Sequence, residues 1–109
     1  WVYKAYNVLW VYEIWEGERR MNFSDALECV KKGARIHRDG WNGKGMFVYY
    51  VPKGSYAPYT HIANELINSD GLVEYEPYLA IKNVKGTVST WVPSINDILA
   101  NDWNIDMEF

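Results

Sequence analysis

Residues 34–51 read ARIHRDGWNGKGMFVYYV: a short apolar segment, a turn with three glycines and a longer run of β-forming residues. Strand-forming residues on both sides of a glycine-rich turn predict two antiparallel strands, over 34–37 and 46–51. A loop of this length also permits other paths of the chain. With the hairpin, the sequence predicts a domain built on an antiparallel sheet.

A short helix is expected just before this hairpin. Asn22 is suited to cap its first turn, with Asp25 three residues later, and Gly33 is suited to end it. Apolar side chains recur at the spacing of one helical face, at Phe23, Ala26, Leu27 and Val30.

The chain after the hairpin alternates between turns and short elements. Residues 52–58 have the composition of a loop, and 61–68 are expected to form one or two helical turns. A second hairpin is predicted from 75–84 and 87–92, around the turn at 83–86. Ser94 is expected to cap a helix, with Asp97 at the third helical position of a capping box and with Ile95, Ile98 and Leu99 on the apolar side. Residues 102–109 are expected to form a closing strand.

This pattern predicts one compact α+β domain, an antiparallel sheet with short helices packed on it. Residues 1–20 are rich in aromatic side chains and are expected to add a strand ahead of the domain, which covers residues 21–109.

Composition excludes several classes of protein. The net charge of −3 argues against a binder of nucleic-acid polymers. The single cysteine, Cys29, excludes an internal disulfide and is expected to be a small core residue of a cytosolic protein. The apolar runs are too short to span a bilayer, so no membrane partner is expected. Six Trp and nine Tyr are many for one small core, which favours an oligomer.

The glycine turn is a candidate ligand site. Glycines let backbone N–H groups approach a ligand, Trp41 could stack on a planar ring, and Arg38 and Lys44 could meet negative charge. The alternative is a plain β-turn whose tryptophan belongs to the core.

Two later segments have a similar character. Trp91 ends a strand just before the helix start at Ser94, where free N–H groups could hold a phosphate. Asp102 could accept a hydrogen bond from a ribose hydroxyl. In the alternative, Ser94 is only a cap and Trp91 belongs to the sheet core, while Trp103 is expected to be an apolar plug that docks the last strand.

The sequence lacks recognisable catalytic or metal-binding motifs. His37 is expected to be structural and His61 to face solvent, and the spacing of His, Cys and carboxylates favours neither a nucleophile nor a metal site. Carboxylates that meet in space stay an alternative, among Glu74, Glu76, Asp97, Asp102 and Asp106. We therefore expect a protein that is not an enzyme and has no cofactor or metal.

In combination, four motifs resemble the phage-encoded Thoeris anti-defence protein 2 family over residues 21–105. They are NFSDAL, RDGWNGKG, TWVPS and DILANDW. The resemblance implies a compact α+β protein that forms homotetramers in the cytoplasm of the infected bacterial host.

The family's activity, carried over by resemblance, is that of a sponge. Such a protein sequesters a cyclic ADP-ribose isomer, glycocyclic ADP-ribose, without degrading it, and some members also bind cyclic oligonucleotide signals at a separate site. By motif, Trp41 and Trp91 would be the pocket aromatics, with Asn42 and Gly43 beside them. Contacts to phosphate and ribose would come from among Arg38, Lys44, Ser89, Thr90, Ser94 and Asp102. The alternatives are a phosphodiesterase or hydrolase that degrades such signals, and a protein-interaction module.

Overall fold

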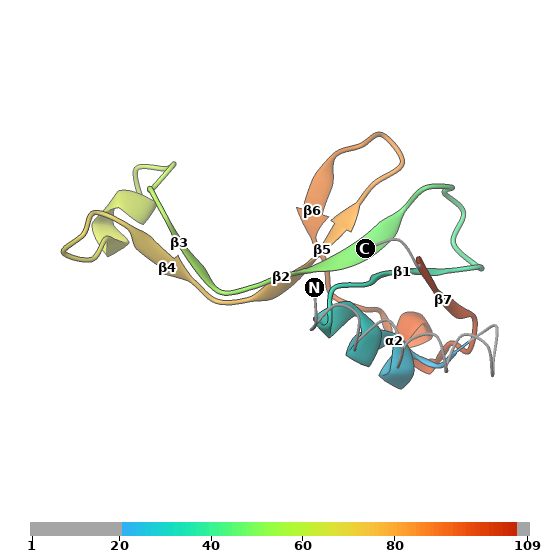
Figure 1. Ribbon diagram of the computed structural model, residues 1–109. Coiled ribbons are helices and arrows are strands. Elements are labelled where there is room, and N and C mark those ends of the chain that lie inside the picture. Colours follow the sequence, from blue (N-terminus) through green and yellow to red (C-terminus); the bar gives the residue numbers. More distant parts are fainter. Residues whose placement is uncertain (1–20, 107–109) are drawn as a thin grey trace.

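The structure, a computed structural model, describes residues 21–106. The strand expected within residues 1–20 and the last three residues of the expected closing strand therefore lie outside the described residues. A five-stranded antiparallel sheet forms the body, in the order β6-β5-β2-β1-β7 (Figure 1). Its strands are β1 (Arg35–Arg38), β2 (Phe47–Val51), β5 (Tyr78–Lys82), β6 (Val88–Thr90) and β7 (Trp103–Asp106). The predicted α+β class is confirmed.

Both predicted hairpins are present in this sheet. Ile36 of β1 lies opposite Val48 of β2 across the glycine turn, and β5 pairs with β6 across the turn at 83–86. The last strand, β7, pairs with β1, so that Trp103 lies opposite Arg38. This pairing brings the start of β7 to the base of the glycine turn.

Helix α2 (Phe23–Lys31) covers one face of the sheet, and its side chains form the core with those of the strands. Asn22 caps it as predicted, since its side-chain oxygen accepts a hydrogen bond of 2.9 Å from the Asp25 N–H. Cys29 is fully buried, and burial raises the pKa of its thiol to about 12. The cysteine is therefore a small core residue, as the sequence predicts. None of the helices within 21–106 is long and apolar enough to cross a membrane.

Residues 52–77 form an arm that extends from the body in Figure 1. The prediction of a loop over 52–58 is wrong in part, because β3 (Gly54–Tyr56) pairs with β4 (Val73–Tyr75). Between them lies η1 (Ala63–Leu66), one turn of 3-10 helix within the predicted helical region. The strand expected over 75–84 is interrupted at 76–77, since Pro77 has no N–H to donate to a ladder.

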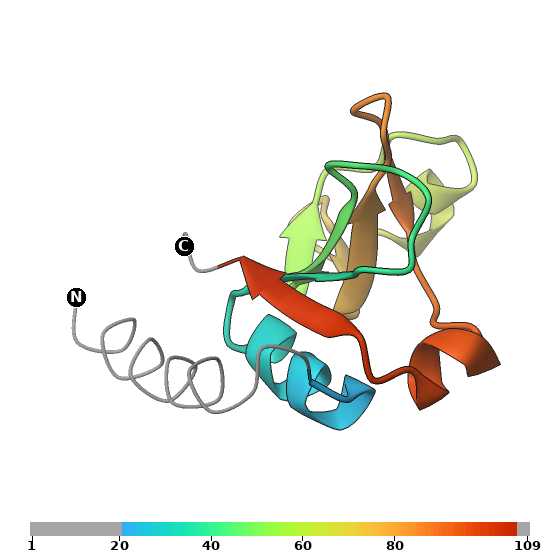
Figure 2. The same ribbon diagram turned by 90° about the vertical axis from the view of Figure 1, so that its right-hand side faces the viewer.

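Helix α3 (Ile95–Leu99) lies beside α2 at one edge of the body (Figure 2). Ser94 caps it in the predicted capping box with Asp97. Its apolar side, however, faces outward: Ile95 is 68% and Leu99 72% exposed, whereas Asp97 is buried. The helix is held to the body through a carboxylate instead of through its apolar residues.

Candidate functional site

Three tryptophans from distant parts of the chain meet at the base of the glycine turn. Trp41 comes from the turn, Trp91 follows β6, and Trp103 opens β7. The ring centroids of Trp41 and Trp103 are 5.4 Å apart, those of Trp91 and Trp103 6.1 Å, and those of Trp41 and Trp91 6.3 Å. All three pairs meet edge to face.

Burial separates the roles of these rings. Trp103 is fully buried, which confirms it as the plug that docks the last strand. Trp41 and Trp91 are half-buried and pack against that core. The two indoles predicted to line a pocket therefore lie next to each other at the surface of the core.

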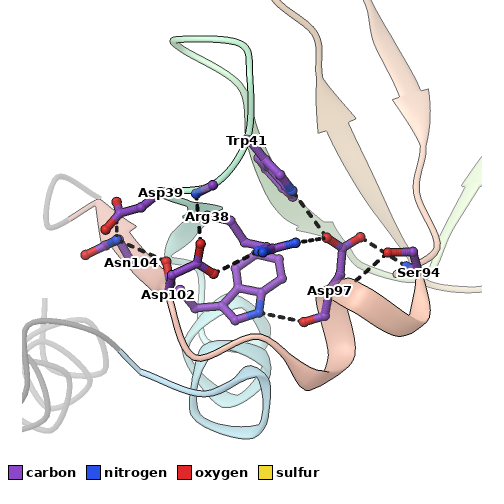
Figure 3. Close-up of polar contacts among 9 residues, drawn as sticks. Arg38, Asp39, Trp41, Ser94, Asp97, Asp102 and Asn104 are labelled. Atoms are coloured by element: carbon purple, nitrogen blue, oxygen red, sulfur yellow. Dashed lines mark hydrogen bonds and ion pairs between the residues drawn. The ribbon is translucent and has the colours of Figure 1, made fainter.

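Beside the tryptophans, Arg38 is held between two carboxylates, and we call Arg38, Asp97 and Asp102 the Arg38 clasp (Figure 3). The Arg38 Nε atom donates to Asp102 Oδ1 at 2.8 Å, and its Nη1 atom donates to Asp97 Oδ1 at 2.9 Å. The clasp joins the end of β1 to α3 and to the start of β7. Because these side chains are largely shielded from water, their attraction is stronger than that of surface ion pairs.

The contacts within the clasp shift the pKa values of all three groups. Burial by itself would raise the pKa of Asp97, but hydrogen bonds from Ser94, Arg38 and Trp41 outweigh it and leave the pKa below its ordinary value. The hydrogen bond from Arg38 lowers the pKa of Asp102, and the two carboxylates raise the pKa of Arg38. Both carboxyl groups are therefore ionised at neutral pH.

Asp102 also fixes the first part of the glycine turn. Its Oδ2 atom accepts a hydrogen bond of 2.8 Å from the Gly40 N–H, and a Cβ at position 40 would lie 2.8 Å from the same oxygen. Gly45 has a φ of +82°, a conformation that side chains disfavour. A Cβ at Gly43 would collide with the side chains of Val84 and Met46. Each of the three glycines is thus required by the backbone or the packing of the turn.

A shallow hollow of about 240 Å³ lies inside the turn. Four of the predicted site residues line it, namely Arg38, Trp41, Gly43 and Lys44, together with His37, Asp39, Gly45 and Met46. Asn42 is exposed on the same turn, whereas Trp91 does not line this hollow. His61, expected to face solvent, is exposed on the arm.

The remaining predicted site residues do not line this hollow. The Ser94 hydroxyl accepts a hydrogen bond from the Asp97 N–H, and the Ser94 N–H donates to Asp97 Oδ2, so Ser94 is engaged in capping. Thr90 lies opposite Ala80 on the exposed edge strand. Contacts of Ser94, Thr90 and Asp102 with phosphate or ribose stay predictions.

Asp97 is the residue whose importance the sequence did not reveal. Its place three residues after Ser94 predicted a capping role, and otherwise Asp97 was only one of five carboxylates that could meet in space. In the structure its carboxylate also accepts from Arg38 and from Trp41 Nε1, and its backbone oxygen accepts from Trp103 Nε1 at 2.8 Å. No spacing rule connects Asp97 to residues almost sixty positions earlier, so only the folded chain shows these contacts.

Residues 21–105 match the sequence model of the Thoeris anti-defense 2-like domain. The matched residues include Trp41, Trp91, Trp103 and the Arg38 clasp. The chain belongs to the Thoeris anti-defence 2 family. Thoeris anti-defense 2 of Bacillus phage SP01 is 36% identical over 87 residues, which cover 79% of this chain and 94% of that relative. Family membership supports a phage anti-defence role. Residues 1–20 lie outside the family match.

Proposed function

We propose that this protein is a phage anti-defence sponge. It binds glycocyclic ADP-ribose, the cyclic ADP-ribose isomer that signals in the bacterial Thoeris system, and sequesters it without degradation in the host cytoplasm. The observation that carries the proposal is the pair of half-buried indoles, Trp41 and Trp91, beside a glycine turn that carries a cation at Lys44. Indole faces suit a purine ring, and a flexible cation suits a diphosphate.

Of the two cations that the sequence predicts for ligand binding, Arg38 and Lys44, the clasp occupies one. Arg38 already donates to two carboxylates, so its positive charge is compensated within the protein. Lys44 is exposed on the turn and lines the hollow beside Trp41. We therefore assign the diphosphate contact to Lys44. Arg38 is assigned a structural role, in which it joins β1 to Asp97 and Asp102 beneath the glycine turn.

The ionisation of the clasp supports sequestration over hydrolysis. A hydrolase acting through paired carboxylates needs one of them protonated at neutral pH, which requires a raised pKa. Asp97 and Asp102 do meet around Arg38, but the pKa of each is lowered. This pair is suited to holding Arg38 in place and not to donating a proton.

A second copy of the chain is the partner in this proposal, as a homotetramer. The hollow of about 240 Å³ is smaller than the roughly 300–1,000 Å³ of typical ligand pockets, so a second subunit is needed to enclose a nucleotide. Large apolar side chains are exposed on the arm, where Tyr59 is 100% and Ile62 73% exposed, and on α3. These two surfaces are the candidate interfaces.

We extend the proposal to cyclic oligonucleotide signals at a separate site. Arg35 and Lys82 flank the Phe47 ring on the open side of the sheet, with cationic centres 4.7 and 5.6 Å from its centroid. They line a groove of about 500 Å³. Two cations beside an aromatic ring suit a ligand with two phosphates and planar bases. Such a ligand has to compete with Asp106, which lines the same groove 3.6 Å from Arg35, so Lys82 is the cation better suited to a phosphate.

The test is a mass balance of signal and protein. Purified protein is dialysed against a limiting amount of glycocyclic ADP-ribose and then heat-denatured, and the released nucleotide is identified by mass spectrometry. We expect depletion before heating and recovery of unchanged nucleotide after it. Lys44→Ala should weaken the depletion, whereas Lys85→Ala, on the turn between β5 and β6, serves as the matched control.

Other outcomes identify the alternatives. A nucleotide of altered mass would show a degrading enzyme, and no depletion together with a stable protein partner in a pull-down would show an interaction module. The same dialysis with a cyclic dinucleotide tests the second ligand. If it competes with glycocyclic ADP-ribose, there is one site and not two.

A further inference from the structure

Asp97 does not line the hollow itself, but its buried carboxylate accepts hydrogen bonds from Arg38 and Trp41, which do (Figure 3). We propose that Asp97 is a positioning residue that fixes the orientation of the Trp41 indole and so preorganises the face on which the nucleotide stacks. This inference rests on the proposed function for its consequence in binding. The orientation of Trp41 itself can be measured without any ligand.

The two carboxylate oxygens of Asp97 have different partners. Oδ2 accepts from the Ser94 N–H at 3.0 Å, which belongs to the helix cap. Oδ1 accepts from Arg38 Nη1 at 2.9 Å and from Trp41 Nε1 at 3.3 Å. One oxygen therefore serves α3, while the other connects α3 to the indole of the glycine turn.

The position of Trp41 in the chain makes such a restraint necessary. Hydrogen bonds fix the backbone on both sides of this position, since the Gly40 N–H donates to Asp102 and the Trp41 N–H to the Arg38 oxygen. They leave the direction of the half-buried Trp41 side chain to its own contacts. The edge contacts with Trp91 and Trp103 limit where the ring lies. The hydrogen bond to Asp97 Oδ1 adds direction, since it fixes the pyrrole edge of the indole.

The Arg38 clasp restrains Asp97 in turn. Arg38 is held from its other side by Asp102, and the Asp97 backbone oxygen accepts from the buried Trp103 indole. The acceptor that Trp41 meets is thus fixed by β1, β7 and the core before any ligand arrives. A ligand that stacks on an already oriented ring loses less conformational entropy on binding.

Three substitutions separate the positioning of Trp41 from helix capping and from stacking. Asp97→Asn removes the charge and one acceptor oxygen. The amide then faces Trp41 Nε1 either with its NH2 donor, which cannot accept, or with a neutral oxygen, which is a weaker acceptor than a carboxylate. The contact with Trp41 is weakened in both orientations. Ser94→Ala weakens the cap but leaves both carboxylate oxygens. Trp41→Phe keeps a stacking ring and removes only the indole N–H donor.

The experiment combines NMR of the tryptophan indole N–H groups with a double-mutant cycle in glycocyclic ADP-ribose affinity. We expect the Trp41 indole resonance, assigned from its loss in Trp41→Phe, to move in Asp97→Asn and to stay in place in Ser94→Ala. We expect Asp97→Asn to weaken binding about tenfold, the loss that follows if the unrestrained indole has the binding orientation about one tenth of the time. In the Trp41→Phe background the same substitution should have little effect.

An unmoved Trp41 resonance in Asp97→Asn, or an equal loss of affinity in both backgrounds, would overturn the inference. If the parent protein does not bind the nucleotide, the proposed function fails and the NMR comparison alone decides whether Asp97 orients Trp41. If Asp97→Asn does not fold, hydrogen exchange of the parent provides the answer. A Trp41 indole N–H that exchanges as fast as free tryptophan would then exclude the hydrogen bond.

Discussion

The indole rings of Trp41, Trp91 and Trp103 differ in their burial and in their contacts. Trp103 lies in a strand with both faces packed and donates its N–H to a backbone oxygen, so it is part of the core. Trp41 and Trp91 pack against it with one side and leave surface for a ligand. The edge-to-face contacts mean that the three rings contribute jointly to stability.

Alanine substitution should separate these roles. Trp103→Ala should lower the free energy of unfolding by about 3–5 kcal/mol, as for other large core rings. Trp41→Ala should lower it by less and should weaken nucleotide binding by about 1–3 kcal/mol, the contribution of one stacked base. Urea unfolding and isothermal titration measure the two effects. A Trp41→Ala protein as unstable as Trp103→Ala that still binds normally would place Trp41 in the core.

At the scale of elements, the arm and the outer face of α3 are the parts that contribute least to the packing of the body. The strands of the arm and η1 contact mainly one another. Helix α3 is anchored by Asp97 and leaves Ile95 and Leu99 exposed. Exposed apolar side chains in two separate places are typical of subunit interfaces.

Removal of the arm should therefore change assembly without unfolding the body. Val51 and Tyr78 lie opposite each other in the sheet, so an Asn-Gly turn that replaces residues 52–77 can close β2 and β5 as a two-residue hairpin. We expect a folded protein with native-like circular dichroism and a smaller assembly by light scattering. An unchanged assembly would exclude the arm as an interface, and an unfolded body would show that the arm supports the sheet.

At the scale of the whole molecule, the Arg38 clasp joins the two ends of the described chain. It connects the strand that follows α2 to the helix and strand at the other end, and it does so through charge. Stability should therefore depend on the protonation of Asp97 and Asp102.

The direction of this dependence follows from the lowered pKa values. Each carboxyl group has a folded-state pKa below its ordinary value of 3.8, so its contribution is fully present above about pH 4 and is lost as the pH falls through the folded-state pKa. We expect the free energy of unfolding, measured by urea titration, to decline below about pH 4. Asp102→Asn should be less stable at neutral pH and should decline less steeply. An identical acid slope in both proteins would mean that other groups cause the acid sensitivity.

Much of the fold could be predicted from the sequence because it depends on neighbours along the chain. The Asn22 and Ser94 caps, both hairpins and α2 follow from turn residues, capping residues and apolar spacing within a few positions. The arm was missed because β3 and β4 are too short to show a pattern of their own. They are strands because they form hydrogen bonds with each other in the folded chain.

The sequence by itself therefore determined the local elements, the antiparallel class and the motifs that indicate the family. Only the tertiary structure decided that Trp41 and Trp91 are half-buried beside the core and that Arg38 is engaged by two carboxylates. It also decided that Asp97, which is a capping residue in the sequence, orients toward Trp41. The physical reason is distance along the chain: Arg38 and Asp97 are separated by 59 positions. Contacts between such remote residues are fixed by strand register and packing, which no local pattern contains.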